Sequence, residues 1–265
     1  MGMMQLVVLA VVQGLTEFLP ISSSGHLVLV PSIFGWTDQG LAFDVAVHFG
    51  SLIAVCVFFR FDIVALFRGT HDILTGDARS ADARMVWNLG LGTIPAAVAG
   101  LLFAAWIAAN LRDPRVVVVT LAAYGILMAL VDRLAPAERN ITDIRLRDAI
   151  IIGCAQAFAL VPGTSRSGIT ITMGRLLGVA RQDAARFSFL LSAPIILLAT
   201  MYEAVNLITG EVPVAWDNLA LAVLISAFVA YLSIEFFMRV VSRIGLLPFA
   251  IYRLLLAGLI VYVVI

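Results

Sequence analysis

The chain has 265 residues, of which 62% are hydrophobic and 13% charged, and its mean hydropathy is +1.05. Its 17 basic and 17 acidic residues cancel, so nothing in the composition favours a nucleic-acid partner. These values exclude an ordinary water-soluble domain and predict an all-α polytopic membrane protein. The two cysteines each stand alone in an apolar run, so they imply neither a disulfide nor a metal framework.

Apolar segments follow one another along the whole chain and are too long for the alternating strands of a membrane barrel. Four of them are too short to cross ~30 Å of hydrocarbon at 1.5 Å per helical residue. The helices expected in chain order are 3–19, 23–35, 41–59, 85–108, 115–131, 148–160, 166–178, 184–207, 218–240 and 246–264.

The four short segments form two pairs, each joined by a polar island that contains Pro, Gly and Ser. Non-helical backbone at membrane depth is tolerated only where it is buried in protein or faces a water-filled cavity. Each pair is therefore predicted to be a re-entrant hairpin that enters and leaves on one side. About six full crossings remain, namely 41–59, 85–108, 115–131, 184–207, 218–240 and 246–264.

The two polar islands are copies of each other. Both contain Ser-x-Ser-Gly, beginning at Ser22 and Ser165, and both follow a glutamine at the same distance, Gln13 and Gln156. Three predicted crossings separate the hairpins, so the second hairpin should enter from the opposite face. We therefore expect one integral membrane domain, 1–265, with an inverted repeat of roughly 1–135 and 146–265.

Arginine alone sets the topology, because the chain contains no lysine. Most arginines fall in four loops that the predicted topology places on one side, which should be cytoplasmic. The other side has Arg112 and Arg115, while the 208–217 loop has Glu211 and Asp217 and no arginine. This bias places both termini and the mouth of the first hairpin outside. The four loops carry Arg60, Arg68, Arg79 and Arg84, then Arg133, Arg139, Arg145 and Arg147, then Arg181 and Arg186, then Arg239 and Arg243.

Two further features concern packing only. The polar stretches 69–83 and 132–148 are expected to be solvated loops without chemistry. Small residues let membrane helices approach closely. This role is expected for Gly14, Gly50, Gly92, Gly100 and Gly174.

Ionisable residues within membrane segments are costly and are functional candidates by default. Glu17 and Arg166 are the strongest. Gln13 precedes Glu17 by four positions, so both side chains share one face of the first short helix. His26 follows at the start of the next helix. The first island then adds Ser22, Ser23, Ser24 and Gly25.

The second island supplies hydroxyls, flexible backbone and a guanidinium. Helix N-termini following each island would aim positive dipole ends at the same place, and arginine donors suit phosphate oxygens. If the tips meet, Glu17 and His26 would act as general base and acid, with a serine as nucleophile or phosphate ligand. The residues of this island are Gly163, Thr164, Ser165, Arg166, Ser167 and Gly168.

Structural alternatives remain for several of these groups. Glu17 and Arg166 could be a buried ion pair that joins the hairpins, although such pairs are weak stabilisers. The serines could simply satisfy the broken backbone, and His26 could be a packed core histidine. Asp44 and His48 could line the cavity. Arg253 and Glu235, in the last two apolar segments, could pair or reach the cavity.

These residues resemble the undecaprenyl-pyrophosphate phosphatase family of bacteria, of the bacitracin-resistance type. Gln13-x-x-x-Glu17 is similar to its (E/Q)-x-x-x-E motif, residues 20–26 to P-x-S-S-x-G-H, and residues 162–170 to P-G-x-S-R-S-x-x-T. The resemblance continues through 92–95, 187–194 and 248–253, so it spans nearly the whole chain.

The resemblance implies hydrolysis of undecaprenyl diphosphate, a C55 lipid, to the monophosphate and phosphate, with dependence on Mg²⁺ or Ca²⁺. The site would open to the outer face of the bacterial plasma membrane, and a homodimer is a further expectation. Gln13 stands where members often have glutamate, which leaves Glu17 as the metal ligand. The implied catalytic residues are Glu17, Ser23, His26 and Arg166, surrounded by Gln13, Ser22, Ser24, Ser165, Ser167 and Thr170.

Two other classes of protein are alternatives to the phosphatase interpretation. Paired re-entrant hairpins in an inverted repeat are also a transporter architecture, so the chain could flip a polyprenyl phosphate. An intramembrane serine protease would need a G-x-S-x-G serine with a distant histidine, whereas His26 lies next to the serines. Phosphate release in detergent separates hydrolysis from transport.

Overall fold

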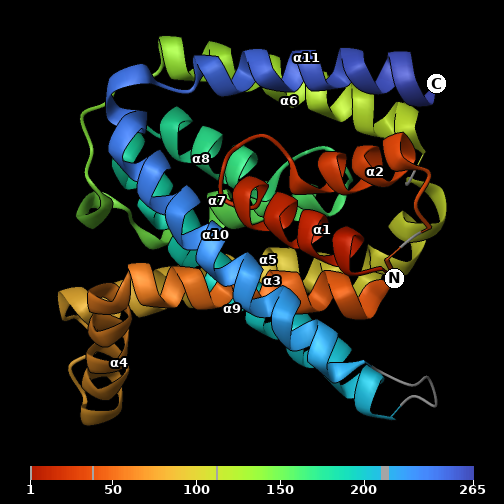
Figure 1. Cartoon of the computed structure of the whole chain (residues 1–265). Coiled ribbons are helices and arrows are strands. Elements are labelled where there is room, and N and C mark those ends of the chain that lie inside the picture. The colour runs from red at the N-terminus through yellow and green to blue at the C-terminus, as the bar shows by residue number, and fades with distance from the viewer. Residues whose placement is uncertain (1, 38, 112, 210–214) are drawn as a thin grey trace.

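A computed structural model describes residues 2–37, 39–111, 113–209 and 215–265, so Arg112 and Glu211 of the predicted outer loops lie outside the described residues. The described chain is built from helices, with one isolated β-bridge between Arg139 and Val179 (Figure 1). The helices are α1 Met3–Thr16, α2 Ser23–Phe34, α3 Leu41–Phe58, α4 Arg60–Thr75, α5 Ala81–Asn110, α6 Pro114–Leu134, η1 Ile141–Asp143, α7 Leu146–Ala157, η2 Phe158–Leu160, α8 Arg166–Leu176, α9 Arg181–Thr209, α10 Trp216–Ile244 and α11 Leu247–Val264.

Five helices, α5, α6, α9, α10 and α11, are long and apolar enough to cross a membrane. The pair α3 and α4 also passes as a whole, although an 84° bend separates its two halves. The described residues thus supply five to six crossings, as expected for the polytopic membrane protein that the composition predicts. Helix α3, which corresponds to the predicted crossing 41–59, is counted as a crossing only together with α4.

Helix α4 corrects the prediction of a solvated loop over 69–83. It continues to Thr75 and ends at Gly76, whose φ of +98° gives the left-handed C-terminal cap that glycine adopts readily. An added Cβ at Gly69 would lie 2.4 Å from the Asp82 carbonyl oxygen, so α4 packs closely on the start of α5. Its polar residues suggested a loop, but they occupy a helix face that is exposed.

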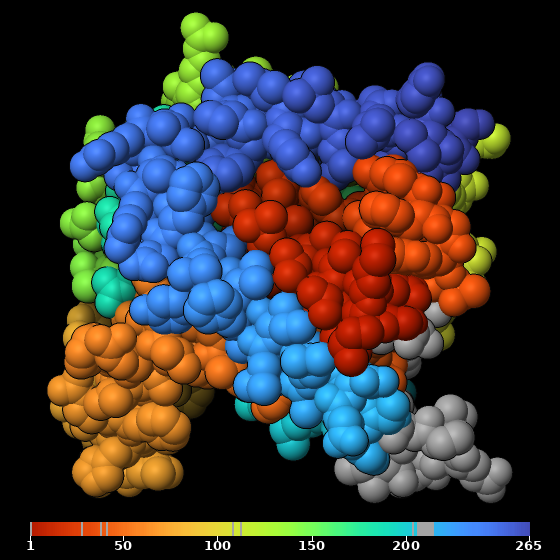
Figure 2. Space-filling view, viewed as in Figure 1, coloured from red at the N-terminus to blue at the C-terminus, as the bar shows by residue number. Residues whose placement is uncertain are grey.

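Short helices form the two predicted pairs, α1 with α2 and α7 with α8. Helix α1 packs on α10, and α7 packs on α5. Helix α2 contacts α11, and α8 contacts α6. Figure 2 shows α1 and α2 at the surface between α10 and α11. A core of buried aromatic rings, including Phe18, Phe189, Phe237 and Phe249, fills the centre where these helices meet.

Ion pairs between helices gather at one end of the molecule. Both termini lie at one end in Figure 1, while α4 and the turn between α10 and α11 lie at the other. At that second end, Asp132 accepts hydrogen bonds from Arg175 and Arg181, and Arg186 pairs with Asp62. Parts of the predicted loop 132–148 are therefore anchored by ion pairs instead of being freely solvated.

Four of the five predicted packing glycines lie against neighbouring helices. An added Cβ would lie 2.7 Å from a backbone oxygen at Gly14, 2.4 Å at Gly50 and 3.0 Å at Gly92, and 3.1 Å from the Ala184 Cβ at Gly174. Gly100 is different, because the nearest atom would be 4.0 Å away. Its close-packing role is therefore not seen.

Gly153 of α7 allows the tightest of these helix contacts. A Cβ there would lie 1.9 Å from the Gly92 carbonyl oxygen of α5. Gly153→Ala should destabilise the protein by at least about 1–3 kcal/mol, because rigid backbones must separate. Thermal unfolding in detergent, followed by circular dichroism, measures the loss. Gly100→Ala is the matched control, and equal melting temperatures for the two variants would contradict the close α5–α7 contact.

Candidate functional site

The two Ser-x-Ser-Gly turns have the same unusual geometry. Ser22 has φ +75° and Ser165 has φ +70°, and they are the only described non-glycine residues with positive φ. The Ser22 Oγ accepts from the Gly25 N–H at 3.3 Å, and the Ser165 Oγ accepts from the Gly168 N–H at 3.1 Å. These bonds cap α2 and α8. Side chains in this backbone region are strained, and such strain gathers at functional sites.

The two turns also touch each other. The Gly163 N–H donates to the Ser24 Oγ at 3.1 Å, and the Ser167 Oγ donates to the Leu19 carbonyl at 3.1 Å. The serine that precedes the glycine of each motif, Ser24 or Ser167, thus forms a hydrogen bond with the backbone just before the other motif. As a result the N-termini of α2 and α8, which carry partial positive charge, lie close together.

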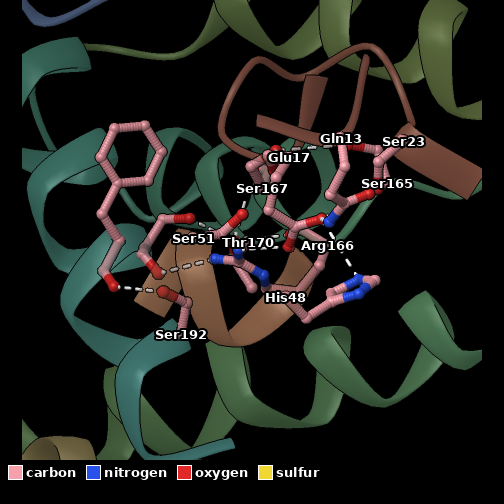
Figure 3. A network of polar contacts seen from close by, with 12 residues as sticks. Gln13, Glu17, Ser23, His48, Ser51, Ser165, Arg166, Ser167, Thr170 and Ser192 are labelled. Atoms are coloured by element: carbon pink, nitrogen blue, oxygen red, sulfur yellow. Dashed lines mark hydrogen bonds and ion pairs between the residues drawn. The ribbon is translucent and has the colours of Figure 1, made fainter. Parts of the chain in front are cut away.

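Glu17 is at the centre of the polar network in Figure 3. One carboxylate oxygen accepts hydrogen bonds from the Gln13 amide and from the Ser23 hydroxyl, both at 2.9 Å. The other accepts from the Arg166 guanidinium at 2.8 Å. The His48 Nε2 lies 3.6 Å from the carboxylate. The Glu17 side chain is only 7% exposed and that of Arg166 only 12%, so the charges are largely removed from water.

The guanidinium of Arg166 is held from three sides. Besides Glu17, it donates to the Ser188 carbonyl at 3.4 Å and lies 5.4 Å from the centre of the Phe18 ring. Thr170, one turn along α8, shares a 2.6 Å hydrogen bond with the Ser188 hydroxyl. The planar donors of Arg166 are thereby fixed in one orientation.

A cavity of about 380 Å³ opens beside this pair. Its polar lining comes from Glu17, Asp44, His48, Gln156 and Arg166, and the rest is mainly apolar. Both amide atoms of Gln156 are buried without a partner in the described structure, as are the Gln13 Oε1 and the Thr164 hydroxyl. Buried polar groups without partners are costly and are expected to meet a ligand or water. Asp44 and His48 thus line the cavity as the sequence suggested.

His26 does not join this group. Its Nδ1 donates to the Ser22 carbonyl and its Nε2 accepts from the Tyr252 hydroxyl, each at 2.7 Å, and the two rings stack. Because both nitrogens are used, the imidazole in reach of Glu17 is that of His48. The expected placing of His26 beside Glu17 is therefore corrected, since its ring turns toward α11.

Arg253 and Glu235 do not pair with each other. The Arg253 guanidinium is buried and donates to the carbonyls of Leu121 at 3.2 Å and Gly163 at 3.0 Å. Glu235 pairs with Arg239 on the surface of α10. Arg253 thus holds the backbone of the second turn through the Gly163 carbonyl, a role that the sequence pattern did not indicate.

The predicted residues fall into clear groups. Gln13, Glu17, Ser23 and Arg166 form one hydrogen-bonded set, and Ser22, Ser24, Gly25, Gly163, Ser165 and Ser167 shape the two turns around it. The contacts of Ser188 with Thr170 and of Tyr252 with His26 are ones that only the tertiary structure reveals.

A carboxylate and a guanidinium that face a cavity, with a serine hydroxyl bonded to the carboxylate, define a membrane-embedded site suited to an oxyanion such as phosphate. The chain belongs to the family of the Bacitracin resistance protein BacA, which matches residues 6–259.

Full-length relatives agree with this assignment. The chain is 50% identical over 261 residues to "Undecaprenyl-diphosphatase 2" of Stutzerimonas stutzeri, with 97% of each chain covered. It is 51% identical over 263 residues to "Undecaprenyl-diphosphatase" of Hahella chejuensis, covering 99% of this chain and 98% of the relative. "Undecaprenyl-diphosphatase" of Nitrosococcus oceani is 47% identical over 262 residues, with 99% of each chain covered.

Proposed function

We propose that the chain is an undecaprenyl-diphosphatase, which hydrolyses the C55 polyprenyl diphosphate to undecaprenyl phosphate and inorganic phosphate. The reaction recycles the lipid carrier for peptidoglycan synthesis and confers resistance to bacitracin. The hydrogen-bonded series from Ser23 through Glu17 to Arg166 carries the proposal, because it combines a hydroxyl, a base and a phosphate-binding cation. Full-length identity near one half to undecaprenyl-diphosphatases supports the same substrate.

The geometry suggests how the residues act. Arg166 holds the oxygens of the terminal phosphate. Glu17 accepts the Ser23 proton while the Oγ attacks the terminal phosphorus, and the bond from that phosphorus to the bridging oxygen breaks, so undecaprenyl phosphate leaves. Water then attacks the phosphoserine phosphorus. As the bond from that phosphorus to the Ser23 Oγ breaks, Glu17 returns its proton to the Oγ and accepts a proton from the attacking water. Glu17 then releases this proton to solvent, and inorganic phosphate leaves. His48 lies close enough to Glu17 to assist these proton transfers.

His26 receives a different part in this scheme. Its ring holds the Ser22 carbonyl at the start of α2 and is itself held by Tyr252. We assign it the positioning of the turn that carries Ser23. The hydroxyls of Ser22 and Ser165 are used in helix caps, so they shape the turns and leave direct phosphate contact to Arg166.

A divalent cation fits beside Glu17. The Gln13 Oε1 is a buried oxygen without a partner, next to the carboxylate to which the Gln13 amide nitrogen donates. The described residues hold no group of three His, Cys, Asp or Glu side chains for a metal, so phosphate oxygens and water would complete the shell, as is usual for Mg²⁺. Gln13 and Glu17 would hold the Mg²⁺ or Ca²⁺ ion, which would neutralise charge on the phosphates.

The proposal includes the inverted repeat and the two re-entrant hairpins. In the repeat, α1 corresponds to α7, α3 to α9 and α5 to α10. The helix contacts agree with this pairing, because α1 and α3 both contact α10, and α7 and α9 both contact α5. The equal geometry at Ser22 and Ser165 supports the same relation. With the arginine-rich end in the cytoplasm, the site would face the outside of the bacterial plasma membrane and both termini would lie outside. We also propose a homodimer, because apolar helix faces are exposed and could contact a second copy of the chain.

Release of phosphate from undecaprenyl diphosphate by the purified protein in detergent tests the function. Hydrolysis needs no sealed membrane, so we expect multiple turnovers. The rival, a polyprenyl-phosphate transporter, predicts no phosphate release in detergent but movement of the lipid across vesicle membranes. That pair of results would replace the phosphatase assignment by the transporter.

A further inference from the structure

A second and larger cavity, of about 1070 Å³, lies apart from the Glu17–Arg166 site. It is lined by the first turns of α5 and α7, by η1, and by Leu177 after α8. Asn88 lines this cavity and Ala96 lines the smaller one, and eight residues of helix between them span ~12 Å. The two cavities therefore belong to different levels of the bundle, and the larger one lies toward the arginine-rich end.

The charged lining of this cavity is mainly basic. Arg139 is neutralised by Asp148, to which it donates, and Asp143 uses a carboxylate oxygen to accept from the Asn140 N–H. Burial raises the pKa of Asp148, but the hydrogen bonds from Arg139 and from the Arg145 N–H outweigh it, so the pKa lies below its usual value. Asp148 thus remains a carboxylate and cancels the charge of Arg139.

Three further arginines add positive charge to the lining. Asp143 offsets part of this charge, and one of the three, Arg145, is near enough to Asp148 to lower the pKa of that carboxyl. The structure gives no hydrogen bond or ion pair to the guanidinium groups of these residues within its described ranges, and all three are exposed. Arg84 and Arg147 lie on the first turns of α5 and α7, and Arg145 directly precedes α7. The N-terminal dipoles of these helices also favour an anion. The three residues are Arg84, Arg145 and Arg147.

The remaining wall of the cavity is apolar. Trp87 is 43% exposed and Leu146 is 41% exposed, and Met85 and Ile151 complete the wall. Ala81, where the membrane-crossing part of α5 begins, also lines the cavity. The cavity thus lies at the depth of the lipid headgroups, where tryptophan is favoured. A soluble anion would use the arginines but would leave this apolar wall without a function.

We propose that this cavity binds an anionic phospholipid of the surrounding leaflet, with Arg84, Arg145 and Arg147 around its phosphate and the Trp87 wall along its acyl chain. Basic pockets between membrane helices on the cytoplasmic side favour such headgroups. Arginine donors suit phosphate oxygens in particular. The lipid would join the starts of α5 and α7, two helices that also line the smaller cavity, through Ala96 in the middle of α5 and Gln156 near the end of α7.

Native mass spectrometry of the full chain in detergent, titrated with phosphatidylglycerol or phosphatidylcholine, tests this site. We expect one phosphatidylglycerol to bind at least about tenfold more tightly than phosphatidylcholine. The variant Arg84→Gln/Arg145→Gln/Arg147→Gln should lose this preference and keep phosphatase activity in detergent. The matched control is Arg79→Gln/Arg133→Gln/Arg243→Gln, which removes three exposed arginines outside the cavity and should keep the preference.

Each of four outcomes would overturn the proposal. Equal loss in both triple variants would mean general surface attraction, and an unchanged preference in the cavity variant would mean another site. Displacement of phosphatidylglycerol by an equal concentration of inorganic phosphate would make the ligand a soluble anion. If the triple variant does not fold, Arg147→Gln alone should still weaken binding by several fold relative to Arg133→Gln, and equal affinities would contradict the site.

Discussion

Replacing Arg166 with alanine should lower kcat/KM for phosphate release by about a thousandfold or more. The guanidinium donates directly to Glu17, and it lies on the cavity wall where the diphosphate charge must be balanced. Arg166→Lys should recover only part of the activity, because an ammonium group cannot offer paired planar donors. Single-turnover rates with undecaprenyl diphosphate measure both losses.

Loss of Arg166 also leaves Glu17 as an unpaired buried charge, which can cost about 3–5 kcal/mol of stability. Arg175→Ala provides the matched control for this effect. Arg175 lies on the same helix, is even more deeply buried than Arg166 and binds Asp132, away from the cavity. It should lower the melting temperature while rates per folded molecule stay near those of the wild type. Similar rate losses in both variants would show that Arg166 acts through stability alone.

The architecture was readable from the sequence because the signals were physical and local. Hydrophobic length gave the crossings, and the common spacing of Gln13 with Gln156 and Ser22 with Ser165 predicted equivalent turns. Both turns have the predicted break and cap. Helix α4 was missed since its polar residues suggested a loop, whereas its packing through Gly69 on α5 depends on a contact that sequence cannot show.

The candidate site was predicted less completely. Glu17 and Arg166 could be found because ionisable groups at membrane depth are costly. The orientation of His26 could not be found, because Tyr252, which holds its ring, lies 226 residues further along the chain. His48 approaches Glu17 only because α3 packs beside α1. Gln156 was visible as a repeat partner of Gln13, but its position in the cavity, without a hydrogen bond, required the folded structure.

The repeat thus produced one site from two unequal halves. Its two turns keep the same backbone conformation and hold each other through Ser24 and Ser167. The carboxylate comes from the first half and the guanidinium from the second. Because the two charged groups are bonded directly, neither half contains a complete site by itself.

Glu17→Gln should reduce kcat by about a hundredfold to ten-thousandfold, the range expected for loss of a general base. The amide keeps the shape of the carboxylate but cannot take the proton of Ser23, whose hydroxyl now donates to it at 2.9 Å. Phosphate release under saturating substrate measures the effect. Asp132→Asn is the control, since Asp132 is also a buried carboxylate bonded to two arginines but lies outside the cavity. It should reduce stability and leave kcat per folded molecule nearly unchanged.

A double variant then tests whether Glu17 and Arg166 act as a unit. Groups that act together in one catalytic step show strongly non-additive losses, because removing either one already disables the step. Glu17→Gln/Arg166→Ala should therefore be about as slow as the slower single variant. Removing both charges also relieves the unpaired charge, so the double variant should melt at a higher temperature than Arg166→Ala. Rate losses that multiply would instead assign the two residues to independent steps and contradict the coupled site.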